Sequence, residues 1–297
     1  MPEYPDVVVY LEALDRHVVG KPIQKILVKG ISVLKSYDPP LKMLEGMAPT
    51  GTRRLGKRLI LTFEDDLFLV IHLMVAGRLY WRNAGAKGNK NLLASLDFDH
   101  GQLQLTEAAS KKRASIWLLR GEAQLLEDHD RGGLEPLEID LDTFAGRLTA
   151  QNRTLKRALT MPAIFSGIGN AYSDEILWHA QLTPVRRTSQ LNDSEIERLY
   201  HCVQSTLLDF AERIRAEVGA GFPTKVTAFR PDMGVHGKFN EPCPVCGSPV
   251  QRIVYASNEV NYCATCQNGG KRLADRSLSR LLKDDWPRTI EELDGDL

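Results

Sequence analysis

Long hydrophobic runs are absent from this sequence. None of its apolar stretches approaches the length of about 18 residues that a membrane-spanning helix requires. The N-terminus also lacks a basic segment followed by an apolar one, which is the pattern of a secretory signal peptide. Both absences argue against a membrane-embedded or secreted protein. We therefore expect a cytoplasmic protein that has no membrane partner.

Net charge is absent too, because 38 lysines and arginines balance 38 aspartates and glutamates. This balance does not exclude nucleic-acid binding, since the charges are unevenly distributed. Residues 221–283 carry nine basic and four acidic side chains, or +5, whereas residues 284–297 carry one and six, or −5. A basic segment of this kind suits a phosphate-binding surface, although ordinary solvated surface would give the same counts.

Cysteine is scarce, with five in 297 residues, and four of them fall close together. Cys243 and Cys246 form one Cys-x2-Cys pair, and Cys263 and Cys266 form a second after 16 intervening residues. Two such pairs can converge tetrahedrally on Zn²⁺, and four thiolates leave no open coordination position. The spacing therefore predicts one structural zinc ion. Cys202 stands alone in a helical pattern and is predicted to be a small buried apolar side chain.

The apolar pattern changes along the chain. Helical spacing over residues 5–19, with Pro5 in the first turn, predicts a helix. Short β-type runs follow from about residue 22 to 127, ending with "RASIWLLRGEAQLLE", and predict an antiparallel sandwich packed against that helix. A turn-rich segment lies at 129–140. Three helices are then predicted, with Asn192 or Asp193 capping the last, at 142–160, 171–180 and 193–218.

The segment "SGIGNAYSDEILWHAQLTP" (166–184) contains a glycine turn between two helical patterns. Gly167 and Gly169 interrupt the helical spacing, which resumes after Asn170. A helix that begins there presents unpaired backbone N–H groups to a phosphate oxygen, and the Asn170 side chain could add another donor. A simple helical hairpin with Asn170 as its cap explains the pattern equally well.

The chain begins "MPEYPD". Removal of Met1 would leave Pro2 with a secondary amine, whose pKa near 8 keeps a useful fraction uncharged at neutral pH. Such an amine can attack an aldehyde-like carbon and form a covalent iminium. Glu3 lies beside it and could transfer protons, and Asp6 follows on the same side of the helix. The alternative is that Pro5 and Asp6 only begin a helix.

Together these pieces resemble the Fpg/Nei (formamidopyrimidine-DNA glycosylase / endonuclease VIII) family. That family begins P-E-x-P-E, where this chain has "PEYPD", and its G-I-G-N-x-Y-x-D-E motif appears as "GIGNAYSDE". Its zinc finger matches "VHGKFNEPCPVCG" and "CATCQ". "RRLGKRLIL" aligns with R-x-G-K-Y-L-L and places Lys57 on the lysine of that motif, and "VIHLMVAGRL" resembles I-H-L-x-M-x-G-x-L. The resemblance runs from residue 2 to 267.

The resemblance implies a bifunctional DNA glycosylase/AP lyase that acts as a monomer on duplex DNA with damaged bases or abasic sites. Pro2 would be the nucleophile and Glu3 the acid/base, with Asp6 beside them. Lys57 would contact the lesion and a phosphate. The remaining DNA contacts that it implies are Asn170 and Gly169, at the helix N-terminus, and Lys238 and Arg252 in the finger.

The fold expected from the resemblance is of the α+β multidomain class. It comprises an N-terminal antiparallel β-sandwich with a leading helix, a helix–two-turns–helix domain and a C-terminal zinc finger. A short helix carrying Ala274, Leu278, Leu281 and Leu282 precedes the acidic tail. The expected boundaries are 1–130 for the catalytic sandwich, 131–141 for a linker, 142–222 for the helical domain, 223–267 for the finger and 268–297 for a C-terminal extension.

Some positions depart from the family pattern. Asn258 occupies the place of the finger arginine that promotes a second elimination, so we predict that β-elimination dominates, unless Arg252 or Lys238 substitutes. Val75 replaces the first wedge methionine, and residues 107–115 lack the phenylalanine wedge. Segment 219–233 is short, which argues against a standard 8-oxoguanine enzyme. Two alternatives remain open: a DNA-binding paralogue with weak or lost glycosylase activity, and a zinc-ribbon scaffold for a protein partner.

Overall fold

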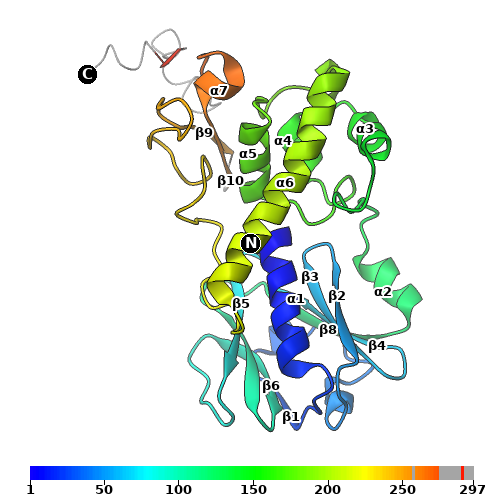
Figure 1. The fold of residues 1–297 in the computed structure, drawn as a ribbon. Coiled ribbons are helices and arrows are strands. Elements are labelled where there is room, and N and C mark those ends of the chain that lie inside the picture. Colours follow the sequence, from blue (N-terminus) through cyan, green and yellow to red (C-terminus); the bar gives the residue numbers. More distant parts are fainter. Residues whose placement is uncertain (256–257, 274–288, 291–297) are drawn as a thin grey trace. The chain divides into compact units, whose positions relative to one another are not determined.

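The computed structural model (Figure 1) describes residues 1–255, 258–273 and 289–290. The chain divides into two compact units. The first consists of Met1–Arg131 and Asp209–Thr227, and the second consists of Gly132–Leu208 and the described part of Ala228–Leu297. None of the helices in the described part is long and apolar enough to span a bilayer.

The first unit contains two four-stranded antiparallel sheets, which confirms the predicted sandwich. One sheet has the strand order β1-β6-β7-β5, and the other has the order β2-β3-β4-β8. The strands are β1 (Lys25–Val28), β2 (Gly51–Leu55), β3 (Arg58–Phe63), β4 (Leu67–His72), β5 (Gly77–Arg82), β6 (Leu92–Phe98), β7 (Gly101–Glu107) and β8 (Ser115–Arg120). Two short 3-10 helices, η1 (Ile31–Val33) and η2 (Leu41–Leu44), lie between β1 and β2.

Helix α1 (Tyr4–Val18) matches the predicted helix to within one residue at each end. It begins with a capping box in which the Asp6 Oδ2 accepts a 2.9 Å hydrogen bond from the Glu3 backbone N–H. Such a box satisfies N–H groups that the first helical turn leaves without partners. The apolar face of the helix is buried in the core of the first unit, so the cap fixes where the chain terminus lies.

Residues 122–127 were predicted as strand, and this was wrong. Gly121 has φ +94°, which turns the backbone away from the extended conformation of β8. The residues after it favour the helical conformation and form helix α2 (Glu122–His129). Leu125 of α2 packs on the face of the β2-β3-β4-β8 sheet that carries Ile60, Phe68 and Val70. A continuous apolar run does not separate a strand from a helix that covers a sheet.

The second unit is largely helical and contains a small two-stranded sheet. Its elements are α3 (Leu141–Thr149), α4 (Leu155–Thr160), α5 (Asn170–His179), η3 (Thr188–Gln190), the start of α6 (Asp193–Val218), β9 (Gln251–Tyr255), β10 (Asn258–Tyr262) and α7 (Ala264–Asn268). The structure confirms the predicted helices at 171–180 and 193–218. Asn192 caps the latter, because its Oδ1 accepts from the Glu195 N–H at 3.0 Å.

The single helix predicted at 142–160 was wrong, because the chain forms α3 and α4 with a break between them. Thr154 has extended backbone and forms a bridge with Arg187, so residues before it cannot continue the helix. This tertiary pairing has no local signal in the sequence. The short helix predicted around Ala274, Leu278, Leu281 and Leu282 lies outside the described residues.

Candidate functional site

The N-terminus of the chain lies in a partly buried, charged environment of the first unit. Burial lowers the pKa of the Met1 amine below its usual value, and the cations Arg78 and Lys57 lower it further. The carboxylates of Glu3 and Asp6 oppose this shift. Pro2 and Glu3 are themselves buried. The structure thus places Glu3, Asp6 and Lys57 near the chain terminus, together with Arg78, which was not among the predicted site residues.

Lys57 lies in the tight turn that joins β2 to β3, where Leu55 pairs with Arg58. Gly56, with φ +61°, supplies the left-handed conformation that this turn requires. The Lys57 side chain is half-buried, and its charge also contributes to lowering the pKa of His72.

The Asp6 carboxylate caps helix α1 by accepting a hydrogen bond from the Glu3 backbone N–H. A carboxylate at this helical position needs only a short side chain to reach the Glu3 N–H. The one-methylene shortening relative to the family's glutamate is therefore compatible with a positioning function for Asp6.

Arg78 is fixed by backbone carbonyl groups of its own unit. Its Nε donates to the Val226 carbonyl at 2.7 Å, and an Nη donates to the Gly77 carbonyl at 2.7 Å. Gly77 is required before it, because a Cβ there would lie 2.3 Å from the Leu73 carbonyl oxygen. The only sequence signal for Arg78 is its place directly after the glycine of the "VIHLMVAGRL" motif.

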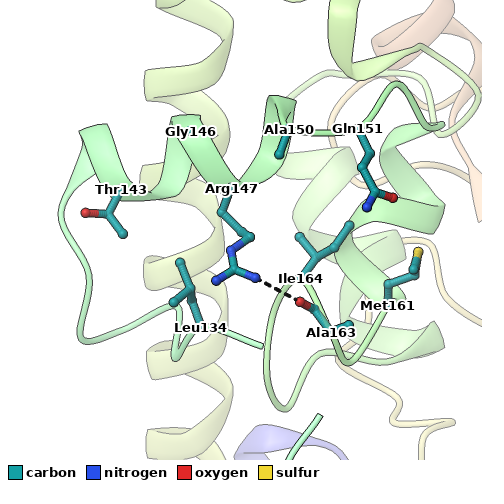
Figure 2. A pocket seen from close by; sticks show the side chains of 9 residues that line it. All are labelled: Leu134, Thr143, Gly146, Arg147, Ala150, Gln151, Met161, Ala163 and Ile164. Atoms are coloured by element: carbon teal, nitrogen blue, oxygen red, sulfur yellow. Dashed lines mark hydrogen bonds between the residues drawn. The ribbon is translucent and has the colours of Figure 1, made fainter. Parts of the chain in front are cut away.

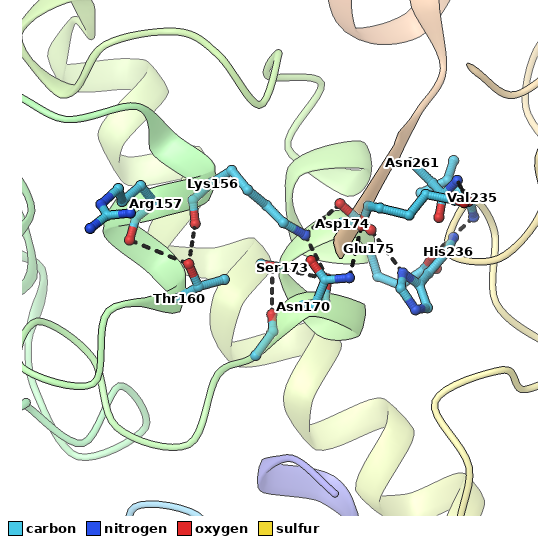
Figure 3. Close-up of polar contacts among 12 residues, drawn as sticks. Lys156, Arg157, Thr160, Asn170, Ser173, Asp174, Glu175, Val235, His236 and Asn261 are labelled. Atoms are coloured by element: carbon cyan, nitrogen blue, oxygen red, sulfur yellow. Dashed lines mark hydrogen bonds and ion pairs between the residues drawn. The ribbon is translucent and has the colours of Figure 1, made fainter. Parts of the chain in front are cut away.

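In the second unit, α5 begins at Asn170, directly after the buried Gly169. The Asn170 Nδ2 donates to the Glu259 carbonyl of β10 at 2.8 Å, which uses one of its two N–H groups (Figure 3). The Lys156 Nζ donates to the Asn170 carbonyl at 2.6 Å. The helix start predicted at Asn170 is therefore present. One N–H of the Asn170 side chain is bound to strand β10 of the finger.

A pocket of about 390 Å³ adjoins the start of α5 and is open to solvent. It contains two cations, Lys156 and Arg157, and hydroxyl groups from two threonines. Its lining is Thr154, Lys156, Arg157, Thr160, Asn170, Pro184, Val185, Ile253 and Val260. Cations, hydroxyls and a helix N-terminus together suit a phosphate group.

A buried polar network joins α5 to residues 234–236, which precede the first cysteine pair (Figure 3). Asp174 accepts from the Lys156 Nζ at 2.6 Å, and its other oxygen lies 2.8 Å from the His236 Nδ1. The Glu175 carboxylate accepts from three consecutive backbone N–H groups, those of residues 234–236, at 2.7 to 2.9 Å. The "DE" of the "GIGNAYSDE" motif thus anchors residues far away in sequence.

The four clustered cysteines meet as predicted. Their sulfur atoms all lie within 4.8 Å of one another, with Sγ–Sγ distances of 3.9 Å for Cys243–Cys266 and 3.4 Å for Cys246–Cys263. Tetrahedral zinc with Zn–S bonds of about 2.3 Å requires sulfur separations of about 3.8 Å, so the arrangement fits the ion. Cys202 is half-buried rather than fully buried, and burial raises the pKa of its thiol.

Two predicted DNA-contacting cations lie in the finger segment. Lys238 pairs with Glu241 at 3.0 Å, and Arg252 lies 3.4 Å from Glu259. The Arg252 guanidinium also stacks over the Phe239 ring at 4.1 Å. Both ion pairs are solvent-accessible, so they contribute little stability and can exchange partners.

A further pocket, of about 450 Å³, lies between α3 and the loop after α4 (Figure 2). Its only charged lining residue, Arg147, donates to the carbonyls of Gly132 and Ala163 at 3.3 and 3.2 Å. The Arg147 side chain therefore binds backbone carbonyls beside the pocket. We assign no function to this pocket.

The sandwich, the glycine turn before α5 and the four-cysteine finger define a class of zinc-finger DNA glycosylases. Family comparisons match the Formamidopyrimidine-DNA glycosylase N-terminal domain at residues 1–115, the corresponding H2TH domain at 133–217 and the Zinc finger found in FPG and IleRS at 240–269. The chain belongs to the formamidopyrimidine-DNA glycosylase family.

Individual relatives agree with this assignment. An uncharacterized formamidopyrimidine-DNA glycosylase-like protein of Mycobacterium tuberculosis is 38% identical over 51% of this chain and 94% of its own length. The formamidopyrimidine-DNA glycosylase of Mycoplasma genitalium is 31% identical over 90% of this chain and 96% of its own. The Lactococcus lactis Fpg bound to abasic-site DNA superposes with a TM-score of 0.78 at 26% identity, covering 90% of this chain and 99% of that one.

Proposed function

We propose that this chain is a DNA repair glycosylase and AP lyase that uses Pro2 as its nucleophile after removal of Met1. The observation that carries the proposal is the environment of the chain terminus, where burial and the cations Arg78 and Lys57 lower the pKa of the Met1 amine. The Pro2 amine takes that terminal place once Met1 is removed. A neutral amine is the reactive form, and such a shift increases its fraction at neutral pH. The structural relatives support the substrate, since one of them is an Fpg bound to DNA that contains an abasic site.

The reaction follows from these groups. The Pro2 nitrogen forms a bond to the sugar C1′, the glycosidic bond breaks, and the base leaves with the bonding electrons and a proton supplied through Glu3. The nitrogen loses its N–H proton, the C1′–O4′ bond breaks with a proton taken up by O4′, and the nitrogen lone pair forms the iminium, which acidifies the C2′ proton. Removal of that proton expels the 3′ phosphate by β-elimination, and water releases the sugar from Pro2. Lys57 contacts the phosphate and assists proton transfer.

DNA binding is assigned to groups on both units. Lys57 belongs to the first unit, whereas Asn170, Gly169, Lys238 and Arg252 belong to the second. The four finger thiolates hold one structural Zn²⁺, which takes no part in the chemistry because no coordination position stays open. The chain is proposed to act as a monomer on duplex DNA.

Borohydride trapping tests the proposal. Reduction during incubation with abasic-site duplex should join enzyme and DNA covalently, and peptide mass spectrometry should place the adduct on Pro2. Glu3→Gln serves as the matched variant, because it keeps the side-chain shape and removes the proton-transferring acid. Absence of any adduct from a chain whose Met1 is shown to be removed would refute the lyase mechanism.

A second candidate is a DNA-binding paralogue with weak or lost glycosylase activity. Two observations favour it: Asn258 stands where the family has arginine, and Val75, at the wedge position, is 58% exposed. Robust duplex binding without release of any base from a lesion panel would support this candidate. Multiple-turnover excision would exclude it.

A further inference from the structure

One arginine of strand β2 contacts two segments of the first unit that the proposed reaction uses. The Arg54 guanidinium lies over the Tyr4 ring, with its Cζ 4.6 Å from the ring centroid. The same guanidinium donates from an Nη to the Gly56 carbonyl at 2.7 Å. Tyr4 is the second residue after Pro2, and Gly56 directly precedes Lys57. Arg54 therefore connects the start of the chain to the hairpin that carries Lys57.

The strand register explains how Arg54 reaches the start of helix α1. Arg54 pairs with Leu59 of β3, whose side chain is fully buried in the core of the first unit. Directly opposite residues of an antiparallel pair project from the same face of the sheet. The apolar face of α1 is buried in that same core. Arg54 thus projects on the side where α1 begins, and its side chain is half-buried there.

The hydrogen bond to Gly56 acts on the backbone immediately before Lys57. The Gly56 carbonyl and the Lys57 N–H belong to one planar peptide group, so a donor bound to this carbonyl fixes the orientation of the whole group. A guanidinium can donate hydrogen bonds in its plane while an aromatic ring contacts its face. One side chain therefore restrains both Tyr4 and the peptide that leads into Lys57.

We propose that Arg54 is a positioning residue for the reaction, and that by stacking on Tyr4 it fixes where Lys57 lies relative to the Pro2 nucleophile. This inference rests on the proposed function, because it uses the roles assigned there to Pro2 and Lys57. The motif R-x-G-K-Y-L-L has an arginine at this place, whereas P-E-x-P-E specifies no residue at position 4. The aromatic partner of the arginine is therefore not specified by the family motif.

Rates of borohydride trapping on abasic-site duplex, measured in single turnovers at saturating enzyme, test the coupling. Tyr4→Leu removes the ring and Arg54→Met removes the guanidinium. Each should slow trapping about 2- to 30-fold, the range that corresponds to loss of a cation–π contact. Tyr4→Phe keeps the ring and should trap at the native rate. Affinity for a duplex that carries unreactive tetrahydrofuran should be unchanged in Tyr4→Leu, since the proposal assigns Tyr4 no contact with DNA.

The pH profile of trapping separates positioning from a general loss of structure. Lys57 and Arg78 lower the pKa of the terminal amine, whereas Glu3 and Asp6 raise it. Displacing Lys57 through Tyr4→Leu should weaken its lowering effect and move the acidic limb of the profile to higher pH. In a Lys57→Met background, Tyr4→Leu should cause no further movement, because the charge that it positions is gone. An equal movement in both backgrounds would overturn the inference.

Arg53→Met is the matched control, because it removes the neighbouring arginine of the same strand, which also lies over an aromatic ring. Arg53 projects to the opposite face of the sheet, where its Cζ is 5.1 Å from the Phe68 ring centroid and an Nη is 2.6 Å from a Glu122 oxygen. Its removal should leave the trapping rate and the pH profile as they are in the native chain. Equal slowing by Arg53→Met and Arg54→Met would indicate a general loss of structure and would refute the positioning role.

Trapping by the native chain separates this inference from the proposed function. Absence of an adduct from a native chain whose Met1 is removed would refute the lyase mechanism, and the inference with it. Normal trapping by the native chain, with an unchanged rate and pH profile in Tyr4→Leu, would refute the coupling alone.

Discussion

At the scale of single residues, four charges act on the amine at the start of the chain, and they act in opposite directions. Arg78 and Lys57 lower its pKa, Glu3 and Asp6 raise it, and burial is the largest influence. The Pro2 amine takes this place once Met1 is removed, so replacing Arg78 by methionine removes one lowering influence and should raise the pKa of the amine that borohydride traps. The acidic limb of the pH profile for borohydride trapping should then move to higher pH.

Arg78→Lys provides the control for that experiment, because it keeps the positive charge and loses the fork of hydrogen bonds to Val226 and Gly77. A profile that moves equally in both variants would indicate a structural effect. A profile that stays in place in Arg78→Met would contradict the assigned charge effect.

Asn258 offers a residue-scale prediction about the products. Asparagine carries no positive charge, so it cannot stabilise the phosphate that leaves in a second elimination. Asn258→Arg should therefore raise the δ-elimination product relative to the β product on abasic-site duplex, as measured by gel mobility of the strand ends. Asn258→Gln, which adds length without charge, should leave the ratio unchanged; an unchanged ratio in Asn258→Arg would count against this account.

Two histidines of the first unit give a pH prediction. Burial, together with nearby cations including Arg58, lowers the pKa of His72 and His129 to about 4, against about 6.5 for free histidine. The unfolded chain then binds more protons between these values, so the stabilising effect is complete above about pH 6.5 and is lost as pH falls toward 4. His129→Phe should reduce this loss in urea titrations across that interval.

The matched control for the pH experiment is His201→Phe on the exposed surface of α6, where the side chain is 65% accessible. That substitution should leave the pH dependence of stability unchanged. A His129→Phe chain that loses stability as steeply as the native one between pH 6.5 and 4 would show that other groups control the effect.

At the scale of elements, helix α5 binds residues 234–236 mainly through the Glu175 side chain. Glu175 is 1% exposed and accepts three backbone N–H groups, whereas the neighbouring carboxylate of Asp174 is already bound to Lys156 and His236. Glu175→Ala leaves these buried donors without their acceptor. The free energy of unfolding should fall by roughly 3 kcal/mol or more in urea titrations.

Glu197→Ala on α6 is the comparison, because that carboxylate is 58% accessible and lies 4.0 Å from His201 in an exposed pair. It should change the free energy of unfolding by less than about 0.5 kcal/mol. Similar effects for the two substitutions would contradict the anchoring role of Glu175.

Elements with strong local signals could be predicted from the sequence. The capped helix α1, the long helix α6 and the two cysteine pairs have periodicity, caps or spacing that need no distant partner. The break before Thr154 depends on pairing with the remote Arg187. The apolar run of helix α2 fits a strand as well as a helix that covers a sheet, so the run alone does not decide between them.

The candidate site divides in the same way. Pro2, Glu3 and Lys57 could be predicted because they lie in short motifs. Arg78 and His236 could not, because their positions result from contacts with Val226 and Asp174, which lie 148 and 62 residues away in the chain. Charge effects and stacking arise only when the fold brings such residues together.

At the scale of the whole molecule, the chain consists of two compact units, and the four finger cysteines belong to the second. Each unit has apolar clusters of its own, and Trp178 of α5 packs against the cluster that contains Cys243 and Cys263. Zinc-thiolate binding contributes directly to folding free energy. Removing the ion with a chelator should therefore destabilise the second unit while the sandwich of the first stays folded.

Calorimetry with and without chelator measures this effect, and Trp178 reports on it locally. We expect one heat-absorption transition to move to lower temperature on chelation, while the transition of the first unit keeps its midpoint. The fluorescence change on chelation should be much smaller in Trp178→Phe, whereas Trp117→Phe, in the first unit, should retain it. If both transitions fell together, or if chelation altered neither, zinc would not be a local support of the second unit.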